Sequence, residues 1–144
     1  MRYFDKNRIF FAGKEKNRLG FDKKKTALQA VELLKKEYPN AICSLVYTVP
    51  HELLIATRLA AQCTDARVNI VCKDLFQKYR SIADFAQADL EDVEQMIKSC
   101  GLYKTKARDI VNMCKMLHEE YNGVMPETVE ELTKLPGIGR KTAN

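Results

Sequence analysis

The sequence predicts an all-α protein, a globular bundle of short helices joined by short turns. Apolar residues recur at three- and four-residue steps over most of the chain, which is the spacing of one helix face. No segment alternates apolar and polar residues as a half-buried strand would. Glycine, proline and asparagine separate the periodic segments. The 144 residues, 46% of them hydrophobic, are enough for a domain with a continuous core.

The first helix is predicted from about Thr26 to Tyr38, where Pro39 ends it. The first 25 residues hold nine lysines and arginines against three acidic residues. This basic segment suits a polyanion, since such side chains displace counterions from phosphates; a solvated flexible leader would look the same. We expect a basic extension of uncertain order over residues 1–22, the helix and a linker over 23–46, and the main helical domain over 47–144.

Two helices are predicted next, separated by a short turn. Proline is well suited to the first turn of a helix, so one is expected from Pro50 to about Gln62. Thr64 and Asp65 can cap the following helix, whose apolar positions continue to Tyr79. This second helix has the clearest amphipathic pattern of the chain.

Four further helices follow in the sequence. Two short ones are predicted around residues 82–85 and 90–97, with Gly101 closing the second as a left-handed cap. A longer helix carries apolar residues from Ala107 to Tyr121 and stops at Asn122-Gly123. The stretch Thr128–Glu131 has capping-box form and begins a short helix.

The last ten residues predict a helix-hairpin-helix motif. Two glycines flank an apolar residue here, which permits a tight hairpin and a close approach of the backbone to a ligand. The free amides of the next helix then favour a phosphate, so the hairpin would bind DNA without reading its sequence. The residues predicted to contact DNA are Leu135, Pro136, Gly137, Ile138, Gly139 and Arg140.

No apolar run approaches the ~20 residues needed to span a bilayer, and the first residues are too charged for a secretory signal. We therefore expect a cytoplasmic monomer without membrane contact. The five cysteines contain no C-x-x-C pair, so neither a disulfide framework nor a zinc site is indicated.

Three segments resemble the endonuclease III family of helix-hairpin-helix DNA glycosylases in order and spacing. They are HELLIATRLAAQCTD, GLYKTKARDI and NGVMPETVEELTKLPGIGRKTAN. The resemblance covers Pro50 to Asn144, about two-thirds of the chain. It implies a bacterial base-excision repair enzyme, associated with the nucleoid through DNA. Such an enzyme removes oxidised pyrimidines from duplex DNA and cleaves the abasic site through a lysine Schiff base.

The resemblance also implies roles for individual residues. Lys141 matches the catalytic lysine, whose amine attacks C1′ of the damaged nucleotide. Gln62 and Leu102 match residues that fill the space left by an extruded base. On the sequence alone, the same residues read as a helix-end glutamine and a leucine packed under the Gly101 turn.

The sequence departs from the family after Asn144. Family members continue with an aspartate that assists departure of the base and with four cysteines that hold a 4Fe-4S cluster. We therefore expect no cofactor in this chain, a truncated form that lacks full activity, and an apolar face without a partner on the Thr26 helix.

Two alternatives remain beside the glycosylase and lyase. One is a non-catalytic helix-hairpin-helix module that only binds DNA. The other is a monofunctional relative that removes mispaired adenine, and Lys141 argues against it because such relatives typically carry another residue there.

Overall fold

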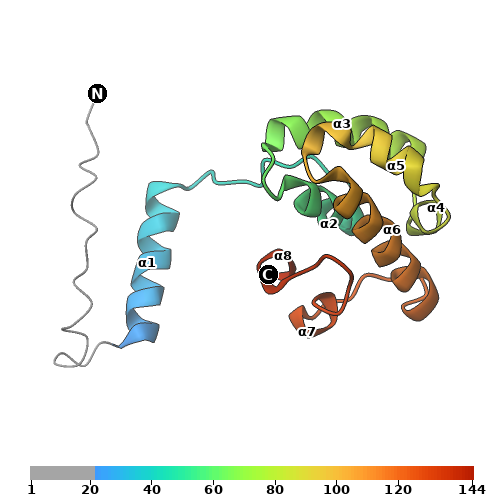
Figure 1. Ribbon diagram of the computed structural model, residues 1–144. Coiled ribbons are helices and arrows are strands. Elements are labelled where there is room, and N and C mark those ends of the chain that lie inside the picture. The colour runs from blue at the N-terminus through green and yellow to red at the C-terminus, as the bar shows by residue number, and fades with distance from the viewer. Residues whose placement is uncertain (1–21) are drawn as a thin grey trace, which may run out of the picture. The chain divides into compact units, whose positions relative to one another are not determined.

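The computed structural model describes residues 22–144, which form helices and turns without a strand (Figure 1). The predicted all-α class is therefore confirmed. The basic extension predicted for residues 1–22 lies outside the described residues except for Asp22. Two compact units divide the chain, one ending at Ile42 and the other comprising Cys43–Asn144. Every helix of residues 22–144 is too short or too polar to span a lipid bilayer.

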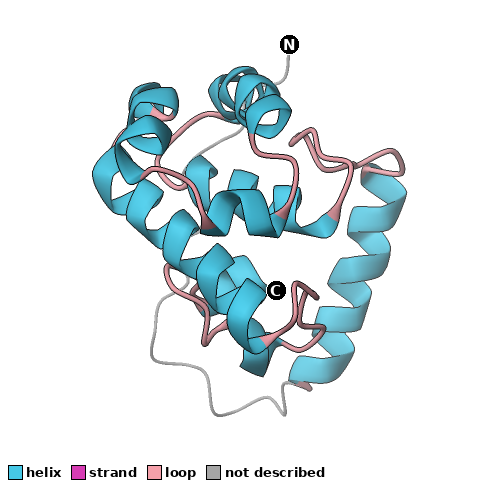
Figure 2. Ribbon diagram, turned by 90° about the vertical axis from the view of Figure 1, so that its right-hand side faces the viewer, coloured by secondary structure: helices cyan, strands magenta, loops and turns pink. Residues whose placement is uncertain are grey.

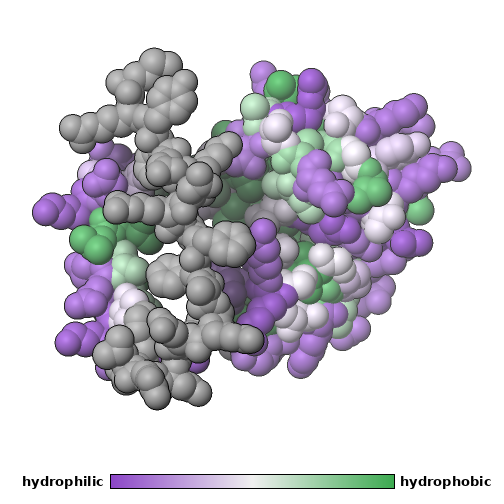
Figure 3. Space-filling model, turned by 60° about the vertical axis from the view of Figure 1, so that its left-hand side comes forward, coloured by the Kyte–Doolittle hydropathy of each residue, from purple (hydrophilic) through white to green (hydrophobic). Residues whose placement is uncertain are grey.

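The first unit contains helix α1, Lys23–Glu37. Its cap is Asp22, whose carboxylate accepts hydrogen bonds from the N–H groups of Lys24 and Lys25 at 3.0 and 3.2 Å. The apolar side chains predicted to share one face of α1 are exposed: Leu28, Val31, Leu34 and the following Tyr38. Figure 3 shows such exposed apolar side chains in green among the hydrophilic ones.

In the second unit, α2 is Pro50–Ala60 and α3 is Asp65–Lys78. Pro50 occupies the first turn of α2, and the Thr64 hydroxyl caps α3, as predicted. The prediction that α2 continues to about Gln62 is wrong by two residues. Ala61 leaves the helical conformation at ψ 110°, and Gln62 has a φ of +59°.

Helices α4, Ile82–Ala86, and α5, Leu90–Met96, lead into a 3-10 helix, η1, Lys98–Cys100. Gly101 ends η1 rather than the helix before it. Its φ of +64° is positive as expected, but a ψ of 152° places it outside the left-handed helical region. The left-handed residue is instead Leu102, which precedes α6.

Helix α6 is Tyr103–Glu120 and stops at Asn122-Gly123, where both residues have positive φ. Two short helices follow: α7, Val129–Leu132, and α8, Arg140–Ala143. The Thr128 hydroxyl accepts a hydrogen bond from the N–H of Glu131 at 3.2 Å. This is one half of the predicted capping box, because the Glu131 carboxylate turns to the Thr128 hydroxyl instead of its N–H.

The core of the second unit lies between α6, α2, α3, α4 and α5. Helix α6 contacts α2, α4 and α5, while α3 contacts α2 and α5 (Figure 2). The large apolar side chains that are fully buried are Ile55, Leu59, Val68, Leu75, Phe85, Val93, Ile97, Ile110, Met113 and Leu117. One charged side chain, Lys106, is buried with them at 0% exposure.

Candidate nucleic-acid interface

The predicted hairpin forms a tight turn between α7 and α8. The N–H of Ile138 donates to the carbonyl of Leu135 at 3.1 Å and closes the turn. The side chains of Leu135 and Ile138 are buried, with 2% and 5% of their surface exposed. These two residues therefore anchor the hairpin in the core. Because their side chains are buried, only their backbone atoms could make the expected contact with DNA.

Gly137 packs against an ion pair of the protein itself. An ideal Cβ on Gly137 would lie 2.7 Å from the Cβ of Asp109 and 2.8 Å from Nε of Arg58. The φ of Gly137 is +74°, a value that disfavours any side chain. Glycine is thus required here by two independent constraints. The close approach is made to Asp109 and Arg58, whereas the sequence predicted an approach to a ligand.

The Arg58–Asp109 ion pair joins α2 to α6 beneath the hairpin. Nη2 and Nε of Arg58 donate to Oδ2 of Asp109 at 2.6 and 3.1 Å, and each side chain is 17% exposed. Both residues lie within the quoted motifs, but sequence reasoning gave them no role. The sequence did hold a signal for this ion pair: both residues are charged and lie on the core-facing sides of two amphipathic helices.

The other side of the hairpin is open. Gly139 has a φ of −91°, which residues with side chains also adopt, and a Cβ built on it meets nothing within 4 Å. Within residues 22–144, the backbone N–H groups of Gly137 and Gly139 donate no hydrogen bond. Pro136 is half-buried, and the side chain of Arg140 is exposed. An anion could therefore approach these amides from solvent.

Lys141 is the second residue of α8, and its side chain is exposed. Helix α8 contacts α7 and α2, so the lysine is carried on an element that packs beside α2.

Gln62 and Leu102 both have the left-handed backbone conformation, at φ +59° and +47°. Such a conformation costs on the order of 1–3 kcal/mol for a residue other than glycine, and it is rare for leucine. The side chain of Leu102 is 64% exposed, so it does not pack under the Gly101 turn. Gln62 is exposed as well. We call residues 61–62 and 100–102 the paired turns.

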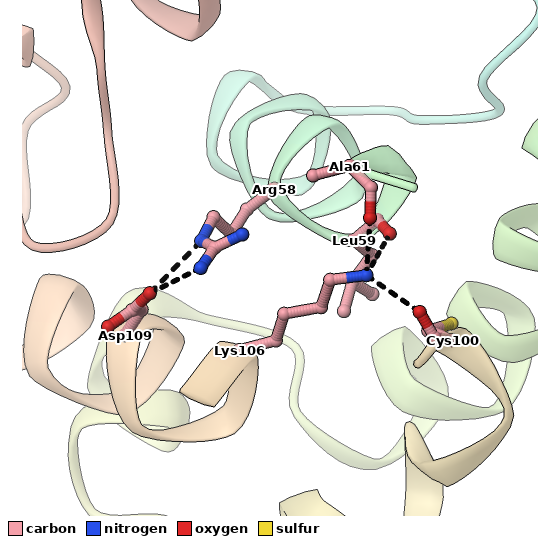
Figure 4. A network of polar contacts seen from close by, with 6 residues as sticks. All are labelled: Arg58, Leu59, Ala61, Cys100, Lys106 and Asp109. Carbon is pink, nitrogen blue, oxygen red and sulfur yellow. Dashed lines mark hydrogen bonds and ion pairs between the residues drawn. The ribbon is translucent and has the colours of Figure 1, made fainter. Parts of the chain in front are cut away.

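A single buried amine lies behind the paired turns (Figure 4). Nζ of Lys106 donates to the carbonyls of Leu59 and Ala61, each at 2.8 Å, and of Cys100 at 2.7 Å. An ammonium has three donors, and each here has its own acceptor. One side chain therefore joins the end of α2 to the end of η1. Sequence reasoning missed this residue.

Burial shifts the pKa values of the groups around this contact. It lowers the pKa of Lys106, and the Arg58 guanidinium lowers it further, while the thiols of Cys100 and Cys63 act in the opposite direction. Burial also raises the pKa of the Cys100 thiol to about 11. Cys100 is therefore a neutral thiol near pH 7.

The cysteines offer no place for a metal cluster in the described part of the chain. Cys72, Cys100 and Cys114 are buried, Cys63 is half-buried and Cys43 is exposed. No group of three or more His, Cys, Asp or Glu side chains gathers among residues 22–144. A 4Fe-4S cluster, which takes four cysteine thiolates, does not fit these residues.

Comparison with known families and proteins gives a consistent picture. The sequence profile described as "HhH-GPD superfamily base excision DNA repair protein" matches residues 55–143. Endonuclease III of Bacillus subtilis (strain 168) is 52% identical over 107 residues, 74% of this chain and 49% of that protein. Endonuclease III of Synechocystis sp. is 47% identical over 122 residues, 85% of this chain and 56% of that protein. The chain thus spans about half the length of the curated relatives it matches.

One solved structure is similar to this chain in both fold and sequence. It is described as "Structure of a Trapped Endonuclease III-DNA Covalent Intermediate: Estranged-Adenine Complex". The similarity has a TM-score of 0.77 at 51% identity, and covers 84% of this chain and 57% of that one.

Proposed function

Because the chain belongs to the HhH-GPD superfamily of base excision DNA repair proteins, we propose that it acts on damaged duplex DNA as a glycosylase and abasic-site lyase. Its substrates would be DNA with oxidised pyrimidines or abasic nucleotides, and it would act as a monomer. The observation that carries the proposal is the exposed amine of Lys141 directly beyond the hairpin whose amides are free.

The hairpin would hold one phosphate of the DNA backbone. The N–H groups of Gly137 and Gly139 are unpaired within residues 22–144 and open to solvent. Arg140 adds a positive charge beside them. These groups carry no sequence information, so binding should depend weakly on base sequence and strongly on salt.

Lys141 would supply the nucleophile. On a damaged nucleotide its amine attacks C1′, and the bond from C1′ to the base breaks. On an abasic site the amine condenses with the sugar aldehyde and releases water, which forms a Schiff base. Elimination then removes a proton from C2′ to solvent and breaks the bond between C3′ and its oxygen, so the 3′ phosphate leaves and the strand is cut. A lysine held near a bound phosphate gains from proximity to the adjacent sugar.

Gln62 and Leu102 would fill the space left by the extruded nucleotide. Both side chains are exposed at left-handed turns, and a polar amide can face the unpaired base while an apolar side chain replaces the lost stacking. The trapped complex of a relative is described with an estranged adenine, which supports the assignment.

Release of an oxidised base needs stabilisation of the charge that develops on the sugar, and a carboxylate is the usual source. Two candidate carboxylates of this chain, Asp65 and Glu131, are engaged locally: the Ser44 hydroxyl donates to Asp65, and the Thr128 hydroxyl donates to Glu131. We therefore propose that residues 22–144 support cleavage at a preformed abasic site and only slow release of an oxidised base. They would do so without a metal cofactor.

The test is trapping with borohydride on two duplexes, one with an abasic site and one with an oxidised pyrimidine. We expect a covalent adduct on the abasic duplex, lost in Lys141→Gln while DNA affinity stays within about threefold. Lys134→Gln is the matched control, because Lys134 is also exposed and lies before the hairpin. An equal adduct yield from Lys141→Gln would show that another amine reacts.

A non-catalytic DNA-binding module is the second candidate. Asp65 and Glu131 each accept a hydrogen bond from a nearby hydroxyl, so neither carboxylate is free to assist departure of a base, and this favours the non-catalytic module. Salt-sensitive binding of the abasic duplex without any adduct would establish this function instead.

A further inference from the structure

Lys106 differs from every other lysine of residues 22–144 because its side chain is fully buried. No carboxylate is hydrogen-bonded to it, and its three acceptors are the carbonyls of Leu59, Ala61 and Cys100. Carbonyls at the end of a helix have no partner within that helix, and together they present partial negative charge. The buried ammonium is thus compensated by the ends of α2 and η1.

Two of these carbonyls lie close in sequence to the exposed residues Gln62 and Leu102: Ala61 directly precedes Gln62, and Cys100 lies two residues before Leu102. The Ala61 carbonyl belongs to the peptide unit that leads into Gln62, so its hydrogen bond fixes the orientation of that peptide plane. The Cys100 carbonyl belongs to the peptide unit before Gly101-Leu102. The backbone N–H of Lys106 also donates to the carbonyl of Leu102 at 3.0 Å. One residue therefore restrains both paired turns.

The paired turns need such a restraint. Gln62 and Leu102 keep an unfavourable φ while their side chains remain exposed, so burial of those side chains does not hold the conformation. Strained residues persist only where the surrounding structure over-determines them. Two of the three hydrogen bonds of Nζ, those to the carbonyls of Ala61 and Cys100, are directed at peptide units of the paired turns, and the third holds the end of α2 (Figure 4).

We propose that Lys106 is a positioning residue that couples the paired turns, so that Gln62 and Leu102 enter the duplex as one rigid unit. This inference rests on the proposed function, because it requires a nucleotide to be extruded beside these side chains. Lys106 itself does not touch DNA, since its side chain is 0% exposed. It acts through the backbone of the two turns.

The experiment uses a duplex with a tetrahydrofuran abasic analogue and 2-aminopurine as the opposite base. Insertion of side chains beside the analogue unstacks 2-aminopurine, and its fluorescence rises. We expect a rise with the unaltered chain at saturation. In Lys106→Met most of this rise should be lost, while the dissociation constant changes by less than about threefold because the hairpin is intact.

Four further variants separate positioning from general stability. Lys115→Met removes an exposed lysine from the same helix and should keep the full rise. The double variant Gln62→Ala, Leu102→Ala should lose the rise, and adding Lys106→Met to it should change nothing further. Lys106→Arg keeps the charge and the donors and should restore part of the signal. A full rise in folded Lys106→Met would overturn the proposal.

A measurement on the unaltered chain covers the case in which neither Lys106 variant folds. In the chain labelled with ¹⁵N-lysine, one ammonium resonance should be protected from exchange, since Lys106 is the only buried lysine of residues 22–144. Protection should persist when the abasic duplex binds. Its loss on binding would contradict the proposal. Absence of both fluorescence rise and salt-sensitive binding in the unaltered chain would instead refute the proposed function.

Discussion

The hairpin and the paired turns both place positive φ values at the protein surface, but they do so with different residues. The hairpin uses glycine at +74° and is anchored by the buried side chains of Leu135 and Ile138. The paired turns contain one glycine, Gly101 at +64°, but they also use glutamine and leucine at +59° and +47°, and they are held by the buried amine of Lys106. One region avoids backbone strain, and the other sustains it.

The difference follows from what each region presents. A hairpin that offers only its N–H groups needs no side chain at the turn, so glycine removes the steric penalty. A turn that has to present a particular side chain cannot use glycine there. The strained conformation is then imposed by contacts from below, and here those contacts come from one lysine. A turn that exposes its backbone N–H groups can therefore use glycine, whereas a turn that exposes a side chain needs contacts that hold its strained backbone.

The largest effect should come from placing a side chain in the hairpin. We expect Gly137→Ala to lower the free energy of unfolding by about 2–4 kcal/mol, because its Cβ would overlap Asp109 at a positive φ. Gly139→Ala should change it by about 1 kcal/mol or less, since nothing lies within 4 Å there. Urea denaturation measures both. Equal losses would mean that the two glycines are not distinguished by the Arg58–Asp109 pair.

The second effect concerns the support of the paired turns. Lys106→Met should lower the free energy of unfolding by about 2–3 kcal/mol, because three carbonyls lose their donor. The exposed Lys115→Met should change it by less than about 0.5 kcal/mol. Thermal or urea unfolding followed by circular dichroism compares the two. Similar small changes would show that water replaces the Nζ donors without cost.

A smaller effect of opposite sign is expected at Leu102. Leu102→Gly relieves the left-handed strain and removes a side chain that is 64% exposed. We expect the free energy of unfolding to stay level or rise by up to about 1 kcal/mol, despite the greater freedom of glycine in the unfolded chain. The 2-aminopurine signal should fall at the same time. Clear destabilisation would mean that Leu102 contributes packing.

The smallest effect is a pH dependence specific to the paired turns. Because the pKa of Lys106 is lowered in the folded state, the unfolded chain binds more protons between that pKa and the ordinary lysine value of about 10.4. Stability of the unaltered chain relative to Lys106→Met should therefore rise with pH across this window. Denaturation at pH 8 and pH 10 measures the difference. A constant difference would mean that burial leaves the lysine unshifted.

The helices could be predicted from the sequence because their signals are local. Thr64 and Pro50 start helices by their own chemistry, and Asn122-Gly123 ends one where predicted. The paired turns could not be predicted in this way. Glutamine and leucine have no preference for positive φ, so their conformation depends on contacts with Lys106, and the contact beside Gln62 spans 45 residues of the chain.

Lys106 carried a signal that was overlooked. It is spaced four, seven and eleven residues before Ile110, Met113 and Leu117, which places it on the buried face of α6. A lysine is almost never fully buried unless it is paired, so a lysine at such a position indicates a buried partner. Its partners are backbone carbonyls of α2 and η1, which no side-chain pattern reveals.

The most direct test of the account is to identify the amine that reacts with abasic DNA. After borohydride trapping, the adduct is digested and its peptides are mapped by mass spectrometry. We predict that the modified residue is Lys141, directly beyond the hairpin, with no adduct at the exposed Lys134. Modification spread over several lysines, or confined to another one, would contradict the assignment of this surface as the site of chemistry.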